Sequence, residues 1–367
     1  MNKKLAVVGA GNGGQALAGH LALLGHKVNL LEHPTYKEKI EAIREKGSNI
    51  QLEGAIEGEG RLEKATVNPE EALEGVEFVF VVAPAFAQRP LIEMIMPFMK
   101  AEMKIILIPG NFGSLELMNF FRKENCEKPL LIGETNTLPY ACRQKNPGVI
   151  DIWGIKTEVL LAVLPSKHNE TARMELEEIF PVNIVKAKNV LETSFSNLNM
   201  VVHCPTMILN AGRIESERGN FRFYTDGMTP SVCKVCEMVD QERIRVGNRL
   251  GLTLQTQKEW LKRSYSLEGD TLYELLQGSP VYGEHGPDAP RILSHRYLTE
   301  DVPYLLVPVA SFGRHLGIPC PLIESIILIA GVINERDFFS EGRTINKLGL
   351  DEIKLENWDK LLDEGIC

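Results

Sequence analysis

Short runs of apolar, largely β-branched residues alternate with amphipathic stretches through the first half of the chain. These runs occupy Lys4–Val8, Lys27–Glu32, Val76–Val82, Lys104–Ile108 and Leu130–Thr137. They are apolar at most positions, as strands buried on both faces of a parallel sheet are. The stretches Pro34–Lys46 and Pro90–Lys100 have helical spacing. Strands that alternate with helices predict an α/β fold with a doubly wound parallel sheet.

Two other stretches lack this alternation of buried strands and helices. Residues 48–67 and 149–184 alternate short apolar runs with turns, and we expect the second of these to form an antiparallel end of the same domain. After residue 192 the spacing becomes helical throughout. The predicted helices cover 193–213, 229–250, 256–265, 270–277, 299–316 and 320–334.

The length of 367 residues exceeds what one ordinary core accommodates, so two domains are expected. We place the boundary in residues 185–192. The predicted domains are a dinucleotide-binding domain at 1–188 and a helical substrate and catalytic domain at 189–367.

Composition narrows the class of partner. The net charge of −9 argues against nucleic acids and anionic membranes, which attract basic surfaces. Ile326–Ile333 is far too short for a membrane span, and Leu5–Val8 is too short for a secretory signal. Seven cysteines without framework spacing are typical of a reducing cytoplasm. Cys233 and Cys236 lie in a helical stretch and are interpreted as packing residues, so no metal site is expected.

A glycine-rich turn follows the first apolar run, within Val8-Gly9-Ala10-Gly11-Asn12-Gly13-Gly14. Gly9 permits a tight turn, Gly11 lets the backbone approach a pyrophosphate, and Gly14 allows close packing of helix on strand. The next residues restart as a helix, whose first N–H groups point at the bound phosphates. Gly9, Gly11, Asn12, Gly13 and Gly14 are therefore predicted to bind a dinucleotide.

Glu32 ends the second apolar run and indicates which dinucleotide binds. A carboxylate at this spacing accepts hydrogen bonds from the adenosine ribose and repels a 2′-phosphate. Glu32 therefore favours NAD(H), although His33 and Lys37 could weaken the repulsion enough for NADP(H) to bind. The alternative is a solvated acid at the end of a strand.

Ligands of a doubly wound sheet bind beyond the carboxyl ends of its strands. Loops at 84–88, 109–114 and 134–137 are therefore expected on the nicotinamide side. Thr135 lies in the last of these.

Asn199 and His203 lie four residues apart and share one face of a predicted helix. Pro205 should kink this helix beside His203. From the residues alone, a buried packing histidine is favoured over a catalytic one at His203. Likewise, Arg296 and Asp301 fit an ordinary helix start capped by Thr299, with acids facing the helix dipole.

The order of motifs resembles that of the opine dehydrogenase family, which includes octopine dehydrogenase and carboxyethyl-norvaline dehydrogenase. The matching stretches are Gly9–Ala16, Gly133–Thr135, Asn199–Pro205, Tyr224–Asp240, Arg296–Pro303 and Gly342–Thr344. This resemblance implies a Rossmann domain followed by an all-helical domain, with the active site between them. It also implies reductive condensation of a 2-oxo acid, usually pyruvate, with the amino group of an amino acid by NAD(P)H.

The resemblance also implies roles for individual residues. His203 would be the general acid and base, and Asp301 its partner. Arg296 would hold the carboxylate of the oxo acid, Thr135 would lie near the same group, and Asn199 fits the substrate-binding helix. Imidazole suits proton transfer near neutral pH, and a guanidinium suits a planar carboxylate.

Two other functions stay open at this point. One is a 2-oxo-acid or hydroxyacid reductase similar to ketopantoate reductase, and the other is a non-catalytic NAD(H)-binding protein. The sequence is also compatible with a homodimer.

Overall fold

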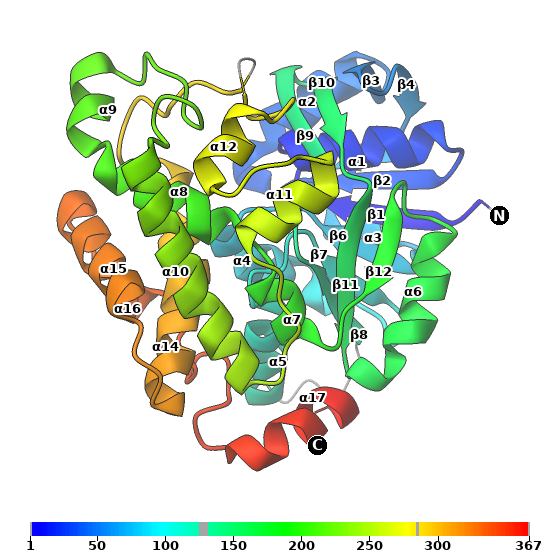
Figure 1. Ribbon diagram of the computed structural model, residues 1–367. Helices are drawn as coiled ribbons and strands as arrows, with labels where there is room; N and C mark the ends of the chain where they lie inside the picture. The colour runs from blue at the N-terminus through cyan, green and yellow to red at the C-terminus, as the bar shows by residue number, and fades with distance from the viewer. Residues whose placement is uncertain (1, 125–130, 284–285, 366–367) are drawn as a thin grey trace. The chain divides into compact units, whose positions relative to one another are not determined.

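A computed structural model describes residues 2–124, 131–283 and 286–365 and separates the chain into two compact units (Figure 1). The first unit comprises residues 1–194 together with 354–367, and the second comprises residues 195–353. The division falls within helix α7 (Val190–Phe195), just after the predicted boundary at 188. The segment 354–367, predicted to belong to the helical domain, lies in the first unit.

The first unit contains an eight-stranded sheet with the order β12-β11-β8-β7-β6-β1-β2-β5. Its strands are β1 (Lys4–Val8), β2 (Lys27–Leu31), β5 (Lys64–Thr66), β6 (Phe78–Val81), β7 (Lys104–Leu107), β8 (Leu131–Thr135), β11 (Glu158–Leu164) and β12 (Asn183–Lys186). The strands from β8 to β5 are parallel, and β11 runs antiparallel to β8, as expected. The predicted strands are confirmed, except that Leu130 lies outside the described residues.

Helices cover both faces of this sheet, which confirms the doubly wound prediction. The alternate side chains of β1 show the two faces: Leu5 and Val7 pack into one core, and Ala6 and Val8 into the other. The helices of the first face are α1 (Asn12–Leu23), α2 (Lys37–Glu45) and α6 (Asn169–Glu177). Those of the second face are α3 (Pro69–Leu73), α4 (Ala85–Ile95) and α5 (Gly113–Lys123).

A second, four-stranded sheet has the order β4-β3-β10-β9 and packs on α1. Its strands are β3 (Asn49–Gly54), β4 (Gly58–Arg61), β9 (Tyr140–Asn146) and β10 (Val149–Ile155). A Cβ on Gly60 would lie 2.1 Å from the carbonyl oxygen of Gly19, so only glycine allows this close approach of strand to helix. The strands in 48–67 were predicted, but the parallel pairing of β10 with β3 was not.

One predicted loop is wrong. Residues 84–88 are not a loop beyond β6, because α4 already begins at Ala85. The predicted helix therefore starts several residues earlier than its spacing suggested, since Pro90 lies inside it rather than at its start. The loop at 109–114 is present, and the left-handed backbone of Asn111 and Phe112 turns the chain into α5.

The second unit is built of helices. They are α8 (Asn199–Leu209), α9 (Ala211–Glu217), α10 (Pro230–Arg249), α11 (Gln257–Tyr265), α12 (Leu272–Gln277), α13 (Arg296–Thr299), α14 (Val307–Leu316), α15 (Pro321–Asn334) and α16 (Phe338–Glu341). The predicted 193–213 helix is divided among α7, α8 and α9. A π-helical turn at Val302–Leu306 separates α13 from α14.

The chain returns to the first unit with α17 (Trp358–Glu364). Within the described residues, no helix is long and apolar enough to cross a membrane.

Candidate active site

The glycine turn of the first unit has the close packing that the motif requires. Gly9 has a φ of +106°, and a Cβ on Gly14 would lie 1.7 Å from the carbonyl oxygen of Gly9. A Cβ on Gly11, in contrast, would meet nothing within 4 Å, so this part of the turn is accessible to a ligand. Gly11 precedes α1, whose first N–H groups have no partner within the helix. These residues fit a dinucleotide pyrophosphate.

Glu32 lies directly after β2 and is 5% exposed. Its carboxylate accepts hydrogen bonds from the backbone N–H groups of Ala10 at 3.0 Å and His33 at 2.8 Å. The glycine turn and the Glu32 carboxylate are therefore joined directly. Lys39, rather than Lys37, approaches this carboxylate, with its Nζ at 3.4 Å.

The side chain of Asn12 points toward the second sheet, where its Oδ1 accepts a hydrogen bond from the backbone N–H of Gln144 at 3.2 Å. Gln15, one turn later, donates to the carbonyl oxygen of Ala10 at 2.8 Å and accepts from the N–H of Gly148 at 2.8 Å. A hypothetical Cβ on Gly13 would lie 2.7 Å from Leu138, in the loop after β8. The start of α1 is thus held by segments far along the chain.

A buried carboxylate lies at the end of β8. Glu134 is fully buried and accepts hydrogen bonds from Ser114 Oγ at 2.6 Å, from Thr193 Oγ1 at 2.8 Å and from the hydroxyl of Ser194. Burial raises the pKa of the Glu134 carboxyl, and the hydroxyl donors partly offset this. Glu134 therefore joins β8, the start of α5 and helix α7.

Thr135, the next residue, is 2% exposed, and its hydroxyl donates to the carbonyl oxygen of Thr137 at 2.9 Å. The Nζ of Lys156 bonds to the hydroxyl of Thr137 and to the carbonyl oxygen of Leu138, the latter at 3.0 Å. Burial lowers the pKa of Lys156 to about 8. A single lysine therefore fastens the loop that follows Thr135.

The second unit brings together the histidine and the acid that the motifs paired. The Nδ1 atom of His203 lies 2.7 Å from Oδ2 of Asp301, although 98 residues separate them along the chain. Both side chains are less than one-tenth exposed. Because a carboxylate only accepts, Nδ1 carries the proton of the neutral imidazole, and Nε2 is left as a hydrogen-bond acceptor.

Two tyrosines that sequence reasoning missed complete this arrangement. The hydroxyl of Tyr224 lies 2.9 Å from Nε2 of His203. The ring of Tyr297 stacks on the imidazole, with centroids 3.7 Å apart and planes 14° apart. Burial raises the pKa of Tyr224 well above its usual value, which keeps the phenol protonated.

Arg296 and Asn199 were predicted to bind substrate. The guanidinium of Arg296 is about half exposed and is held by the buried carboxylate of Glu300, at 2.8 Å. Asn199 is the first residue of α8, and its N–H donates to Oδ1 of Asn197 at 3.1 Å. The capping interpretation of Thr299 is wrong, because this residue ends α13, whose side-chain cap is His295.

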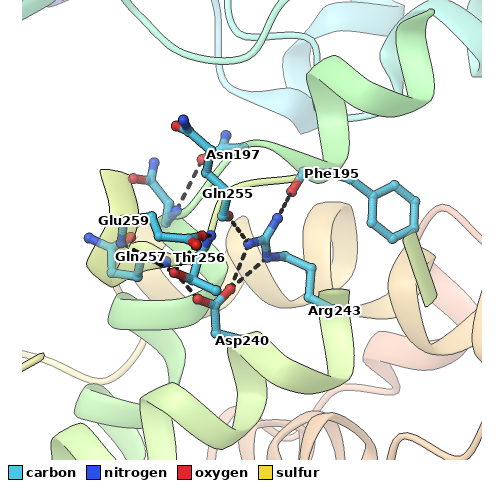
Figure 2. Close-up of polar contacts among 9 residues, drawn as sticks. Phe195, Asn197, Asp240, Arg243, Gln255, Thr256, Gln257 and Glu259 are labelled. Carbon is cyan, nitrogen blue, oxygen red and sulfur yellow. Dashed lines mark hydrogen bonds and ion pairs between the residues drawn. The ribbon is translucent and has the colours of Figure 1, made fainter. Parts of the chain in front are cut away.

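A buried ion pair secures the chain just before α8 (Figure 2). Asp240 accepts two hydrogen bonds from the guanidinium of Arg243, at 2.9 and 2.6 Å. Arg243 also donates to the carbonyl oxygens of Phe195 and Gln255, each at 2.6 Å, and the N–H of Gln257 donates to Asp240 at 2.6 Å. The pair therefore fixes the segment from which α8 and His203 follow.

The cysteine pair behaves as expected of packing residues. Cys233 and Cys236 are buried in α10, and burial raises the pKa of the Cys233 thiol to about 12. A protonated thiol is a poor nucleophile and a poor metal ligand.

Comparisons with known proteins agree with both halves of this description. Residues 4–113 match the family described as NAD-dependent glycerol-3-phosphate dehydrogenase N-terminus. Residues 186–334 match the family described as NAD/NADP octopine/nopaline dehydrogenase, alpha-helical domain. The structure is similar to octopine dehydrogenase solved with NADH and L-arginine, with a TM-score of 0.77 and 21% identity over 100% of this chain and 99% of that one.

Similarity at the sequence level extends along the whole chain. The opine dehydrogenase of Arthrobacter sp. (strain 1C) is 35% identical over 350 residues, which cover 95% of this chain and 96% of that protein. The vitopine synthase of Allorhizobium ampelinum is 28% identical over 352 residues, 95% of each chain.

A dinucleotide-binding sheet joined to a helical unit that carries a paired histidine defines an NAD(P)-dependent dehydrogenase. The chain belongs to the opine dehydrogenase family. Its reaction is the opine type, an NAD(P)H-dependent reductive condensation of an amino acid with a 2-oxo acid, which makes it an enzyme acting on CH–NH bonds. The predicted function is confirmed, and full-length similarity favours it over a ketopantoate reductase-like activity.

Proposed function

We propose that the enzyme condenses pyruvate, or a close 2-oxo acid, with a free amino acid, and that His203 is the general acid and base. The observation that carries this proposal is the buried His203–Asp301 pair, which assigns proton exchange to one nitrogen. A solved octopine dehydrogenase contains NADH and pyruvate, which supports pyruvate as the oxo acid.

The residues of this chain serve the proton steps of the reaction. An amine must lose a proton to attack the oxo carbon, and the oxygen must gain protons to leave as water. An imidazole that is neutral or charged near neutral pH performs both transfers, and Asp301 stabilises its charged form. The bound dinucleotide supplies the hydride that reduces the resulting imine.

We assign the carboxylate of the oxo acid to Arg296. Its guanidinium keeps donors available, since Glu300 engages it at Nη2 and half of the side chain stays exposed. A guanidinium forms paired hydrogen bonds with a carboxylate. Thr135 and Asn199 remain our candidates for further substrate contacts, Thr135 as an acceptor because its proton is given to Thr137.

We assign dinucleotide binding to the first unit and acid–base chemistry to the helical unit of residues 195–353. NAD(H) is the preferred cofactor in this proposal because Glu32 presents a buried carboxylate where a 2′-phosphate would carry like charge. Lys39, at 3.4 Å from that carboxylate, moderates the preference without reversing it.

The substrate test is an NADH-consumption screen of pyruvate and related oxo acids against the common amino acids, with the product mass determined. Strict dependence on an amine, with a product mass equal to the condensed and reduced pair, supports the proposal. Oxidation of NADH by the oxo acid alone would support the reductase instead, and binding without turnover a non-catalytic protein.

The residue test is His203→Ala, with His168→Ala at an exposed position as the matched control. Turnover should fall by about 10² to 10⁴-fold in the first variant only, the range for loss of a general acid or base. Affinity for NADH should stay unchanged, since the glycine turn is intact. Turnover near the wild-type value in His203→Ala refutes the assignment.

The cofactor test is Glu32→Ala. The ratio of kcat/KM for NADPH over NADH should rise at least about tenfold, equivalent to about 1.4 kcal/mol. Lys39→Ala should move the ratio in the opposite direction. An unchanged ratio in both variants would mean that Glu32 does not read the ribose.

We also propose a cytoplasmic location and a homodimer. The cysteines of the described residues are free thiols, as is common in a reducing compartment. Cell fractionation and light scattering of the purified enzyme test the two proposals separately.

A further inference from the structure

Both ring nitrogens of His203 have a protein partner. Asp301 bonds to Nδ1, and the hydroxyl of Tyr224 bonds to Nε2, the nitrogen that must exchange protons with the substrate. Both side chains at Nε2 are almost fully buried, with His203 6% and Tyr224 7% exposed. A proton that leaves or reaches Nε2 therefore meets the oxygen of Tyr224 first.

The backbone around Tyr224 is held on both sides. The N–H of Phe223 donates to the carbonyl oxygen of Pro287 at 3.0 Å, and the side chain of Asn210 donates to the carbonyl oxygen of Gly227 at 2.9 Å. The ring of Tyr282 lies 4.6 Å from that of Tyr224, centroid to centroid. Tyr224 is thus fixed by its surroundings and does not need to be displaced for its oxygen to act.

We propose that Tyr224 is a catalytic residue that relays protons between Nε2 of His203 and the oxygen atom of the substrate. The proposal rests on the role of His203 given above and deepens it. Tyr297, which stacks on the imidazole, is a positioning residue for the same pair.

In the direction of condensation, every proton and bond in the relay is accounted for. His203 begins as imidazolium, with protons on both nitrogens, and Nε2 donates to the oxygen of Tyr224. As the C–O bond of the carbinolamine breaks, its oxygen takes the proton of the Tyr224 hydroxyl and leaves as water. The nitrogen lone pair forms the C=N bond, and Tyr224 recovers a proton from Nε2.

His203 is then neutral, with its remaining proton on Nδ1 toward Asp301. Because burial raises the pKa of Tyr224, the phenol does not persist as a phenolate, and the two proton transfers are coupled. A hydroxyl is suited to this task because it donates and accepts at one atom.

The first test is Tyr224→Phe, with Tyr140→Phe as the matched control. Tyr140 is a buried tyrosine of the second sheet, and its hydroxyl lies 3.1 Å from Nδ1 of His20. We expect kcat to fall about 10²-fold in Tyr224→Phe, with unchanged NADH affinity, and to stay within about threefold in the control. Solvent-isotope mixtures should show two protons in transfer for wild type and one for the variant.

The alternative is that the Tyr224 hydroxyl only shields Nε2 and is displaced when the substrate binds. In that case Tyr224→Phe keeps kcat and lowers KM, and this result overturns the relay. His203→Ala distinguishes a failure of the relay from a failure of the acid–base role of His203. If that variant is inactive while Tyr224→Phe is active, only the relay fails; if His203→Ala is active, the acid–base assignment itself fails.

A second variant replaces Tyr224 with a difluorotyrosine, which keeps the ring and the hydroxyl and lowers the pKa of the phenol. A relay predicts that the basic limb of the pH profile of kcat moves to lower pH. An unchanged profile would refute the proposal even if Tyr224→Phe failed to fold.

Discussion

Lys156 offers a measurable link between burial and stability. Its ammonium group is buried in the first unit, and no acidic side chain among the described residues contributes to its pKa. Burial lowers the pKa of Lys156 from 10.5 to about 8. Between these values the unfolded chain binds more protons than the folded one, so the free energy of unfolding rises with pH.

The magnitude follows from this shift. The full difference of about 2.5 pKa units corresponds to about 3.5 kcal/mol at about 1.4 kcal/mol per unit. Integrated only from about pH 7 to about pH 9.5, the gain is about 2 kcal/mol. Lys156→Met removes the titrating group, so stability of the wild type relative to this variant should rise by that amount over the interval.

The assay is urea unfolding of both proteins at the two pH values, with Lys234→Met at an exposed position as control. Taking the difference between wild type and variant cancels the titration of all other groups. The difference in free energy of unfolding between the control and the wild type should be the same at both pH values. A constant difference for Lys156→Met as well would refute the reasoning, because the buried amine would then titrate as it does in the unfolded chain.

Two further substitutions test the glycine turn and the ion pair of Asp240 with Arg243. Gly14→Ala places a Cβ 1.7 Å from the carbonyl oxygen of Gly9, so the glycine turn must move and the Kd for NADH should rise more than about tenfold. Gly212→Ala, where a Cβ meets nothing within 4 Å, should leave that Kd unchanged in the same fluorescence titration. Arg243→Ala leaves Asp240 buried without its partner, and calorimetry or urea unfolding should register a loss of about 3–5 kcal/mol.

The parts of the molecule that sequence predicts best are those whose signal is local. The strand, glycine turn and helix at Lys4–Leu23 lie in one continuous stretch, and each glycine has its own steric reason. The sequence signal for Glu32 is also local, because this residue directly follows its strand. Prediction from local spacing misplaced the start of α4, because proline usually begins a helix but Pro90 lies inside this one.

The chemistry of the second unit depended on residues far apart in sequence. The pairing of His203 with Asp301 came from a family resemblance, since no spacing rule connects positions 98 residues apart. Tyr224 lay within a matching stretch, but nothing in that stretch indicates that its hydroxyl reaches an imidazole nitrogen. Lys156 gave no signal at all, because its unusual pKa comes from burial that only the folded chain creates.

The return of α17 to the first unit affects how the protein is made. Trp358 and Leu362 of this helix are buried, and Ser166 bonds to Asp363 at 3.1 Å. The first unit therefore lacks one of its packing elements until α17 has been synthesised. The helical unit is in effect an insertion in the first unit. It must be synthesised before α17 can pack and the first unit can complete its fold.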